Sequence, residues 1–182
     1  MTQAHDKKRY NDTYKGTVAL NLDPEMRGRC YVLVPEISPI PLMSPADINF
    51  PFGGAAAGMF APAPMIGSCV WVQFRGGDID KPLVVGARYE NTAEIPALAH
   101  AVPPGVDIKV IATQLQNQLV ISDVPGPTGG IMLLTPTGAG IMINTLGVFI
   151  FASPNPAMGT ISITAAGVDI NGIGPAAALS VR

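Results

Sequence analysis

The sequence predicts an almost entirely β-stranded protein, and three observations support this fold class. The chain of 182 residues contains 20 glycines and 18 prolines, yet 48% of its residues are hydrophobic. These glycines and prolines are better explained as turns between strands than as disorder. No window longer than about ten residues has helical spacing of apolar residues without an internal Gly or Pro. Residues 130–174 contain short apolar runs separated by turn residues, which is typical of a repeated strand unit.

The first part of the chain predicts a small barrel behind a polar arm. Residues 1–13 are polar, and we expect them to form a loosely held N-terminal arm. Strands are expected at 14–21, 30–34, 68–74 and 82–89, with a long Pro-rich connection before the third. Four to five strands with one long connection fit a five-stranded Greek-key barrel of the oligonucleotide/oligosaccharide-binding (OB) type, spanning residues 14–89.

Within this barrel, the third strand has a clear inside and outside. Val70, Val72 and Phe74 share one face, because side chains alternate along a strand. Cys30 and Cys69 lie in apolar runs without metal-ligand spacing, so we expect two buried free thiols.

A Pro- and Ala-rich linker, residues 90–105, separates the barrel from a second domain, residues 106–174. Strands at 106–111 and 118–123 lead into the repeat, which carries no charged residue between Asp123 and Asp169. Each repeat strand places two aliphatic residues on one side. These residues are Ile131, Leu133, Ile141, Ile143, Val148, Ile150, Ile161, Ile163, Val168 and Ile170. A single chain has only one thin layer here and cannot bury them, so we expect them to pack against copies of the same chain.

The opposite side of the repeat strands changes along the chain. Near the end it carries Ser162, Thr164, Asp169 and Asn171, as expected for a solvated surface. In the first three strands it carries an apolar girdle, namely Met132, Leu134, Met142, Phe149 and Phe151. Two interpretations stay open: the girdle contacts lipid or a partner, or it packs on neighbouring loops of the oligomer.

Several function classes find little support in the sequence. The net charge is −2 with scattered basic residues, so no nucleic-acid partner is expected. His5 and His100 have no neighbouring nucleophile, and no G-x-S-x-G motif occurs. Asp78 and Asp80 flank a hairpin turn, where aspartates are common. We therefore expect no enzymatic activity, no cofactor and no metal.

Three motifs follow one another in a fixed order. The barrel hairpin reads G-x-x-V-W-V-x-F-x-G-G-D-x-x-x-P-L-V-V-G, the join to the repeat N-Q-L-V-I-S-D-x-P-G, and the end of the repeat T-A-A-G-V-D-I-N-G. In this order they resemble the central spike proteins of contractile injection systems. These are the baseplate assembly protein V class of phage tails and the C-terminal half of the valine-glycine repeat proteins of type VI secretion. The resemblance covers about residues 14–175.

The resemblance implies an OB-fold collar followed by a triple-stranded β-helix, formed by an intertwined homotrimer. The ten aliphatic residues would then surround a three-fold axis and contribute roughly 15–30 kcal/mol per chain, at about 1.5–3 kcal/mol for each fully buried side chain. The implied function is a structural central spike of a contractile phage tail or related injection particle. It would plug the baseplate end of the tube and puncture the target envelope mechanically, with transient contact with the target membrane.

The resemblance also implies partners and a location. Too few residues precede the barrel to form a hub domain, so we expect a separate trimeric hub protein above the collar. No histidine follows His100, so a His-x-His iron site at the apex is not expected. Instead we expect Leu179, Val181 and Arg182 to form a blunt tip that binds a small cap of the proline-alanine-alanine-arginine (PAAR) type; alternatively, the last eight residues fray. The N-terminus lacks a signal peptide, so a virion or injection-particle protein made in the bacterial cytoplasm is expected.

Two other functions remain alternatives. A trimeric surface β-helix adhesin would carry an export signal and exposed aromatic or polar clusters in its loops. An OB-fold binder of single-stranded nucleic acid with an oligomerisation tail would be retained on single-stranded DNA in a salt-dependent way.

Overall fold

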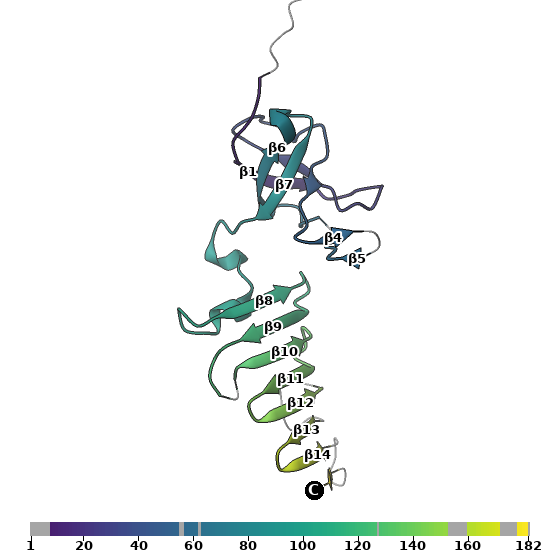
Figure 1. Cartoon of the computed structure of the whole chain (residues 1–182), viewed down its shortest axis with the longest axis vertical. Helices are drawn as coiled ribbons and strands as arrows, with labels where there is room; N and C mark the ends of the chain where they lie inside the picture. The colour runs from purple at the N-terminus through teal and green to yellow at the C-terminus, as the bar shows by residue number, and fades with distance from the viewer. Residues whose placement is uncertain are drawn as a thin grey trace, which may run out of the picture. The chain divides into compact units, whose positions relative to one another are not determined.

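The computed structural model describes residues 8–54, 57–61, 63–126, 128–152, 160–171 and 178–181. The chain forms two compact units, an N-terminal unit, Met1–Thr92, and a C-terminal unit, Ala93–Arg182 (Figure 1). Besides strands and the loops between them, the described residues contain only short 3-10 helices, which are η1 (Arg75–Gly77), η2 (Thr92–Glu94) and η3 (Ala97–His100). The predicted all-β fold class is confirmed.

The N-terminal unit is built on a five-stranded sheet in the order β2-β1-β6-β7-β3. Its strands are β1 (Tyr14–Leu20), β2 (Tyr31–Leu33), β3 (Asp47–Ile48), β6 (Cys69–Phe74) and β7 (Pro82–Ala87). A bridge between Cys30 and Ala46 joins the two edges, with backbone N···O distances of 3.2 and 2.7 Å. The sheet therefore curls back on itself, as expected of an OB barrel.

The barrel core is rich in valine, which suits the pleated surface of strands. Val70 and Val72 are fully buried and Phe74 is 6% exposed, whereas Gln73 on the other face of β6 is exposed. Leu42 and Ala46 are also buried. Both come from the connection between β2 and β6, which the sequence predicted as a loop and which in fact contains β3 and a short hairpin of β4 (Gly53–Gly54) and β5 (Ala57–Gly58). Strands of two residues are too short to show a period in the sequence.

Both cysteines are free and buried, as predicted. Burial raises the pKa of the Cys30 thiol to about 11, so this thiol stays protonated and packs as a small apolar group.

The turn between β1 and β2 is organised by one carboxylate. Asp23, whose side chain is 6% exposed, accepts hydrogen bonds from the backbone N–H groups of Glu25, Arg27 and Arg29, at 2.9–3.1 Å. The Arg29 guanidinium also donates through Nε at 3.2 Å and Nη2 at 2.7 Å. The Arg29 side chain, followed by the backbone donors, holds the pKa of the Asp23 carboxyl well below its usual range.

The C-terminal unit is one eight-stranded antiparallel sheet in which each strand pairs with the next along the chain (Figure 1). Its strands are β8 (Ile108–Ala112), β9 (Gln118–Ser122), β10 (Gly130–Leu134), β11 (Gly140–Asn144), β12 (Gly147–Phe151), β13 (Thr160–Thr164), β14 (Gly167–Asn171) and β15 (Ala178–Val181). Each of the strands β9 to β14 pairs with both neighbouring strands of its own chain, because short connections favour local pairing.

Glycines at strand starts permit this close pairing. Gly147, the first residue of β12, has φ +151°, and a Cβ there would overlap the carbonyl oxygen of Ile163 on β13. Gly130, with φ +101°, has the same relation to the carbonyl oxygen of Ile143. The obstacle at both positions is backbone, which cannot move without breaking the strand pair.

Asp23→Asn is predicted to destabilise the N-terminal unit at pH 7 and to have less effect in acid. A carboxyl with a lowered folded-state pKa stabilises the fold above its unfolded pKa of about 3.9, and this contribution is lost as the pH falls through the folded pKa. Urea unfolding followed by the fluorescence of Trp71, the single tryptophan, measures the difference between variant and wild type. A difference that is equally large at pH 7 and pH 3 would contradict a role for the charge.

Gly147→Ala is predicted to destabilise the C-terminal sheet, by about 1–3 kcal/mol or more, because the added methyl group meets backbone. Gly86→Ala is the matched control, since Gly86 lies in β7 with open space around its Cβ position. Thermal unfolding by circular dichroism should show a lower midpoint for Gly147→Ala only. Equal midpoints for both variants would refute the close approach.

Candidate functional site: the aliphatic face of the C-terminal sheet

The ten aliphatic residues predicted to form the oligomer core lie on one face of the C-terminal sheet. The backbone register places them opposite one another on neighbouring strands, in two columns. One column is Leu133, Ile141, Ile150, Ile161 and Ile170, and the other is Ile131, Ile143, Val148, Ile163 and Val168. We call these ten residues the aliphatic face.

The aliphatic face is largely uncovered in the single chain. Seven of its residues have exposed fractions of 38–49%, namely Ile131, Leu133, Ile141, Ile143, Ile150, Ile163 and Ile170. Val148, Ile161 and Val168 are half-buried. A contiguous apolar surface of this kind marks an interaction site on a protein.

The columns continue onto two strands that the sequence analysis left out of the core. Ile111 pairs with Leu119, Leu119 pairs with Leu133, and Ile121 pairs with Ile131. The alternation of apolar residues in 118–123 could have indicated this continuation. On β8, however, Lys109 lies opposite Ile121 and interrupts the apolar pattern. Lys109 forms an ion pair with Asp107, whose carboxylate raises the pKa of the Lys109 ammonium. On β8 one column therefore ends at Ile111, and the other ends at Lys109.

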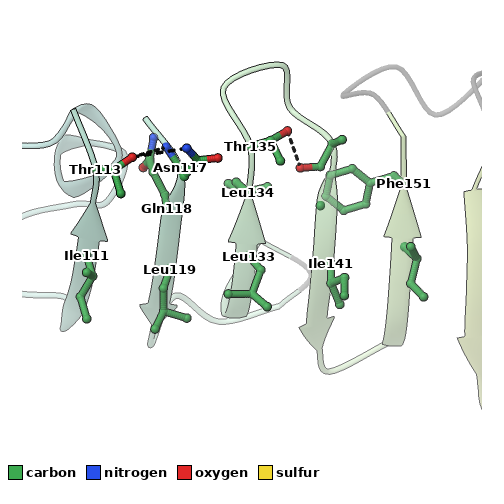
Figure 2. A pocket seen from close by; sticks show the side chains of 13 residues that line it. Ile111, Thr113, Asn117, Gln118, Leu119, Leu133, Leu134, Thr135, Ile141 and Phe151 are labelled. Atoms are coloured by element: carbon green, nitrogen blue, oxygen red, sulfur yellow. Dashed lines mark hydrogen bonds between the residues drawn. The ribbon is translucent and has the colours of Figure 1, made fainter. Parts of the chain in front are cut away.

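A groove of about 550 Å³ lies along one edge of the aliphatic face (Figure 2). Its floor consists of Ile111, Leu119, Leu133, Ile141 and Ile150. Its rim comes from the two loops that join β8 to β9 and β10 to β11. The Thr135 hydroxyl donates to the Ala139 carbonyl at 3.0 Å, and the Asn117 N–H donates to the Thr113 hydroxyl at 3.1 Å. These two hydroxyl groups are thus engaged within their own loops, whereas Oε1 of Gln118, also in the lining, is buried without a hydrogen-bond partner among the described residues. The floor presents apolar side chains.

The apolar girdle, Met132, Leu134, Met142, Phe149 and Phe151, lies on the opposite face of the sheet, where all five side chains are half-buried. Figure 2 shows the Phe151 ring reaching over the strand that carries Ile141. Phe151 is paired there with Gly140, whose lack of a side chain also leaves space for Leu134. An aromatic ring across from a strand glycine is a recurrent way to cover its backbone.

The chain covers the opposite face of the sheet at β8 and β9. Val120 is fully buried and Ser122 is 6% exposed, and η3 contacts β8. Ile121, on the aliphatic face between them, is 43% exposed. The difference indicates which face requires a partner.

The predicted tip residues fall at the end of this sheet. By backbone register Leu179 lies opposite Ile170 and Val181 opposite Val168, so β15 extends the two columns. Arg182 lies outside the described residues, as do the side chains of β15. Cap binding at the tip stays a prediction.

The polar residues outside the C-terminal sheet take part in turns and ion pairs. Asp78 accepts a hydrogen bond from the N–H of Asp80 at 3.2 Å, as expected of a turn. The Arg88 guanidinium lies 5.7 Å from the Trp71 ring centre and pairs with Glu90 at 3.0 Å. Among the described residues, no group of three His, Cys, Asp or Glu side chains is placed to hold a metal. No helix among the described residues is long and apolar enough to cross a membrane.

Two family models match the chain. Residues 14–89 match the type VI secretion system/phage-baseplate injector OB domain, and residues 109–178 match the phage baseplate V C-terminal trimerisation domain. A search of curated proteins found no match. The first match covers the barrel strands and the second covers the aliphatic face, in the order that the resemblance predicted. The chain therefore belongs to the phage baseplate V family of central spike proteins, with an injector OB domain followed by a trimerisation domain.

Proposed function

We propose that this protein is the mechanical central spike of a contractile phage tail or related injection particle. As a trimer, it would plug the baseplate end of the tube and puncture the target envelope. The family establishes the coarser role, a structural component of a phage-baseplate injector that trimerises through its C-terminal domain. The observation that carries the finer proposal is the uncovered aliphatic face, which requires two further chains to form a closed, stiff rod.

Assembly is strongly favoured by burial of this face. Because seven of the ten side chains keep only 38–49% of their surface exposed, roughly half of the full transfer free energy remains to be gained, or about 7–15 kcal/mol per chain. This is less than the sequence-based 15–30 kcal/mol, because neighbouring strands of the same chain already cover the rest. The remaining gain is still comparable to the whole stability of a typical domain.

The sheet is suited to carrying load. Eight strands at about 4.8 Å spacing give the C-terminal unit a length of about 34 Å, with its backbone hydrogen bonds directed along that length. Three such sheets with their aliphatic faces inward would form a prism with a dry core. Strands β9 to β13 carry no charged residue, and the outward face becomes polar at Ser162 and Asp169.

We also propose that the apolar girdle has a packing role in this rod. Its five side chains are already half-buried in the single chain, so they lie against neighbours rather than project freely. Contact with lipid or a partner protein is the competing interpretation.

Two partners complete the proposal. A separate trimeric hub protein would join the OB domain to the tail tube, and a PAAR-type cap would cover the end of the columns at β15. Both are supported by the family resemblance. The particle, a virion or a related injector, is the proposed location.

Ile141→Asp is predicted to abolish the trimer, because three carboxylates would face one another in an apolar core. Asn144→Asp is the matched control: it adds the same charge on the same strand, but on the opposite face, and keeps the oxygen that accepts the Leu146 N–H at 2.8 Å. Light scattering should give one chain mass for the first variant and three for the second. In particles complemented with these variants, gold labelling at the baseplate tip and injection should be lost only with Ile141→Asp. Injection by particles that lack the protein at their tip would refute the puncturing role.

Phe149→Ser together with Phe151→Ser is predicted to lower the unfolding midpoint of the trimer. Because both rings are half-buried, each substitution should lower the free energy of unfolding by half of the usual loss of about 3–5 kcal/mol for a fully buried aromatic. Ser162→Ala, next to Phe149 on the same face, should leave the midpoint unchanged. An unaltered midpoint with reduced injection would instead support contact with lipid or a partner.

A further inference from the structure

Leu146 occupies a position where the fold does not need a large apolar side chain. It belongs to the two-residue turn Thr145–Leu146 between β11 and β12, and its exposed fraction is 56%. Such turns usually carry Gly, Asn or Asp. The equivalent turn between β13 and β14 carries Ala165 and Ala166.

The conformation of the Leu146 turn is set by its polar neighbour rather than by leucine. The Asn144 side chain accepts the Leu146 N–H at 2.8 Å, as Thr164 accepts the Ala166 N–H at 3.2 Å. The leucine side chain is therefore available for another contact.

Leu146 and the groove lie at opposite ends of the strands, which we call the two edges below. In an antiparallel meander, successive connections alternate between these two edges. The loops 113–117 and 135–139, which form the groove rim, lie on one edge, and the turn 145–146 lies on the other (Figure 2). Strands of five residues separate the edges by about 16 Å, so Leu146 does not reach the groove of its own chain.

A ring of three chains brings these two edges together. In a closed cyclic trimer, one surface of each chain meets a different surface of the next chain, at the same height along the axis. The lower end of the groove is lined by Gly140, Ile150 and Phe151 of β11 and β12. These are the strands that Leu146 connects, so the leucine and the groove end share one height.

The aliphatic face alone does not define that height. Its two columns repeat on every strand, so a chain shifted by one hairpin would bury nearly the same residues. A register that slides freely requires a unique feature to fix it. The leucine of the β11–β12 turn, with alanines at the β13–β14 turn, provides one.

We propose that Leu146 of each chain inserts into the groove of the next chain near Ala139, and so locks the three chains in register. This inference rests on the trimer of the proposed function and names the contact that closes it. The groove is thus filled by a second copy of the chain, and its apolar floor suits an apolar side chain.

Disulfide trapping in the full chain tests the contact. Leu146→Cys combined with Ala139→Cys should give a covalent trimer on a non-reducing denaturing gel after mild oxidation, whereas each single variant should run as one chain. The native Cys30 and Cys69 are 0% and 8% exposed, so they contribute little background. Leu146→Cys with Thr113→Cys is the matched control, because Thr113 lies at the other end of the groove, about 14 Å away at strand spacing. This control should not cross-link.

The outcomes separate the contact from the trimer itself. A trimer by light scattering without a covalent band from the Ala139 pair would overturn the insertion while leaving the proposed function standing. Cross-linking of the Thr113 pair instead would overturn the register. A wild-type chain that is monomeric would remove both.

A second pair of variants covers the case in which the cysteine variants assemble poorly. Leu146→Ser should speed subunit exchange between labelled trimers by about tenfold or more, since losses of buried contact act mainly on dissociation. Leu146→Met, which keeps the apolar volume, should stay within about twofold of wild type. Equal exchange rates for the serine and methionine variants would overturn the proposal.

Discussion

The C-terminal sheet has two faces, and its own chain covers only one of them, at β8 and β9. Around Val120 the chain covers the sheet itself, while the aliphatic face stays open from β10 to β14 and Ile121 on β9 is 43% exposed. Hydrophobic burial is the dominant favourable term in folding and association, so this imbalance governs the behaviour of the molecule. In the proposed trimer, assembly and stability of the C-terminal unit are coupled, because the same side chains would supply both.

The two units meet their burial requirements in different ways. The OB barrel closes through the Cys30–Ala46 bridge around its own valine core, while its connections leave large apolar side chains such as Met43 and Phe60 exposed, at 85% and 65%. The C-terminal sheet pairs its strands within the chain but leaves its aliphatic face exposed. A domain with its own closed core, followed by a sheet with an open apolar face, is suited to a part that joins a larger particle and ends in a rod. The family assignment to an injector OB domain and a trimerisation domain agrees with this division.

Strand periodicity made most of this architecture predictable from the sequence. The alternation in Val70, Val72 and Phe74, and in pairs such as Ile141 and Ile143, sets the inner face of each strand, and the register aligns them. Other features left no such signal. The strand β3 has two residues, Lys109 interrupts the column on β8, and pairing within the chain rather than between chains depends on loop lengths. The groove at the β8–β11 loops also arises only when separate loops come together. Side chains at the predicted tip lie outside the described residues, so the sequence remains the sole basis for that expectation.

The native mass of the unmodified full-length chain tests the central claim most directly. Sedimentation over a dilution series should give three chain masses throughout, since each chain gains several kcal/mol by covering its aliphatic face. If the trimer is forced apart, the C-terminal sheet should unfold at the same time, while the Trp71 fluorescence of the folded barrel persists. A folded, soluble monomer at all concentrations would contradict the account, because an aliphatic face that remains open in solution would need no partner chains.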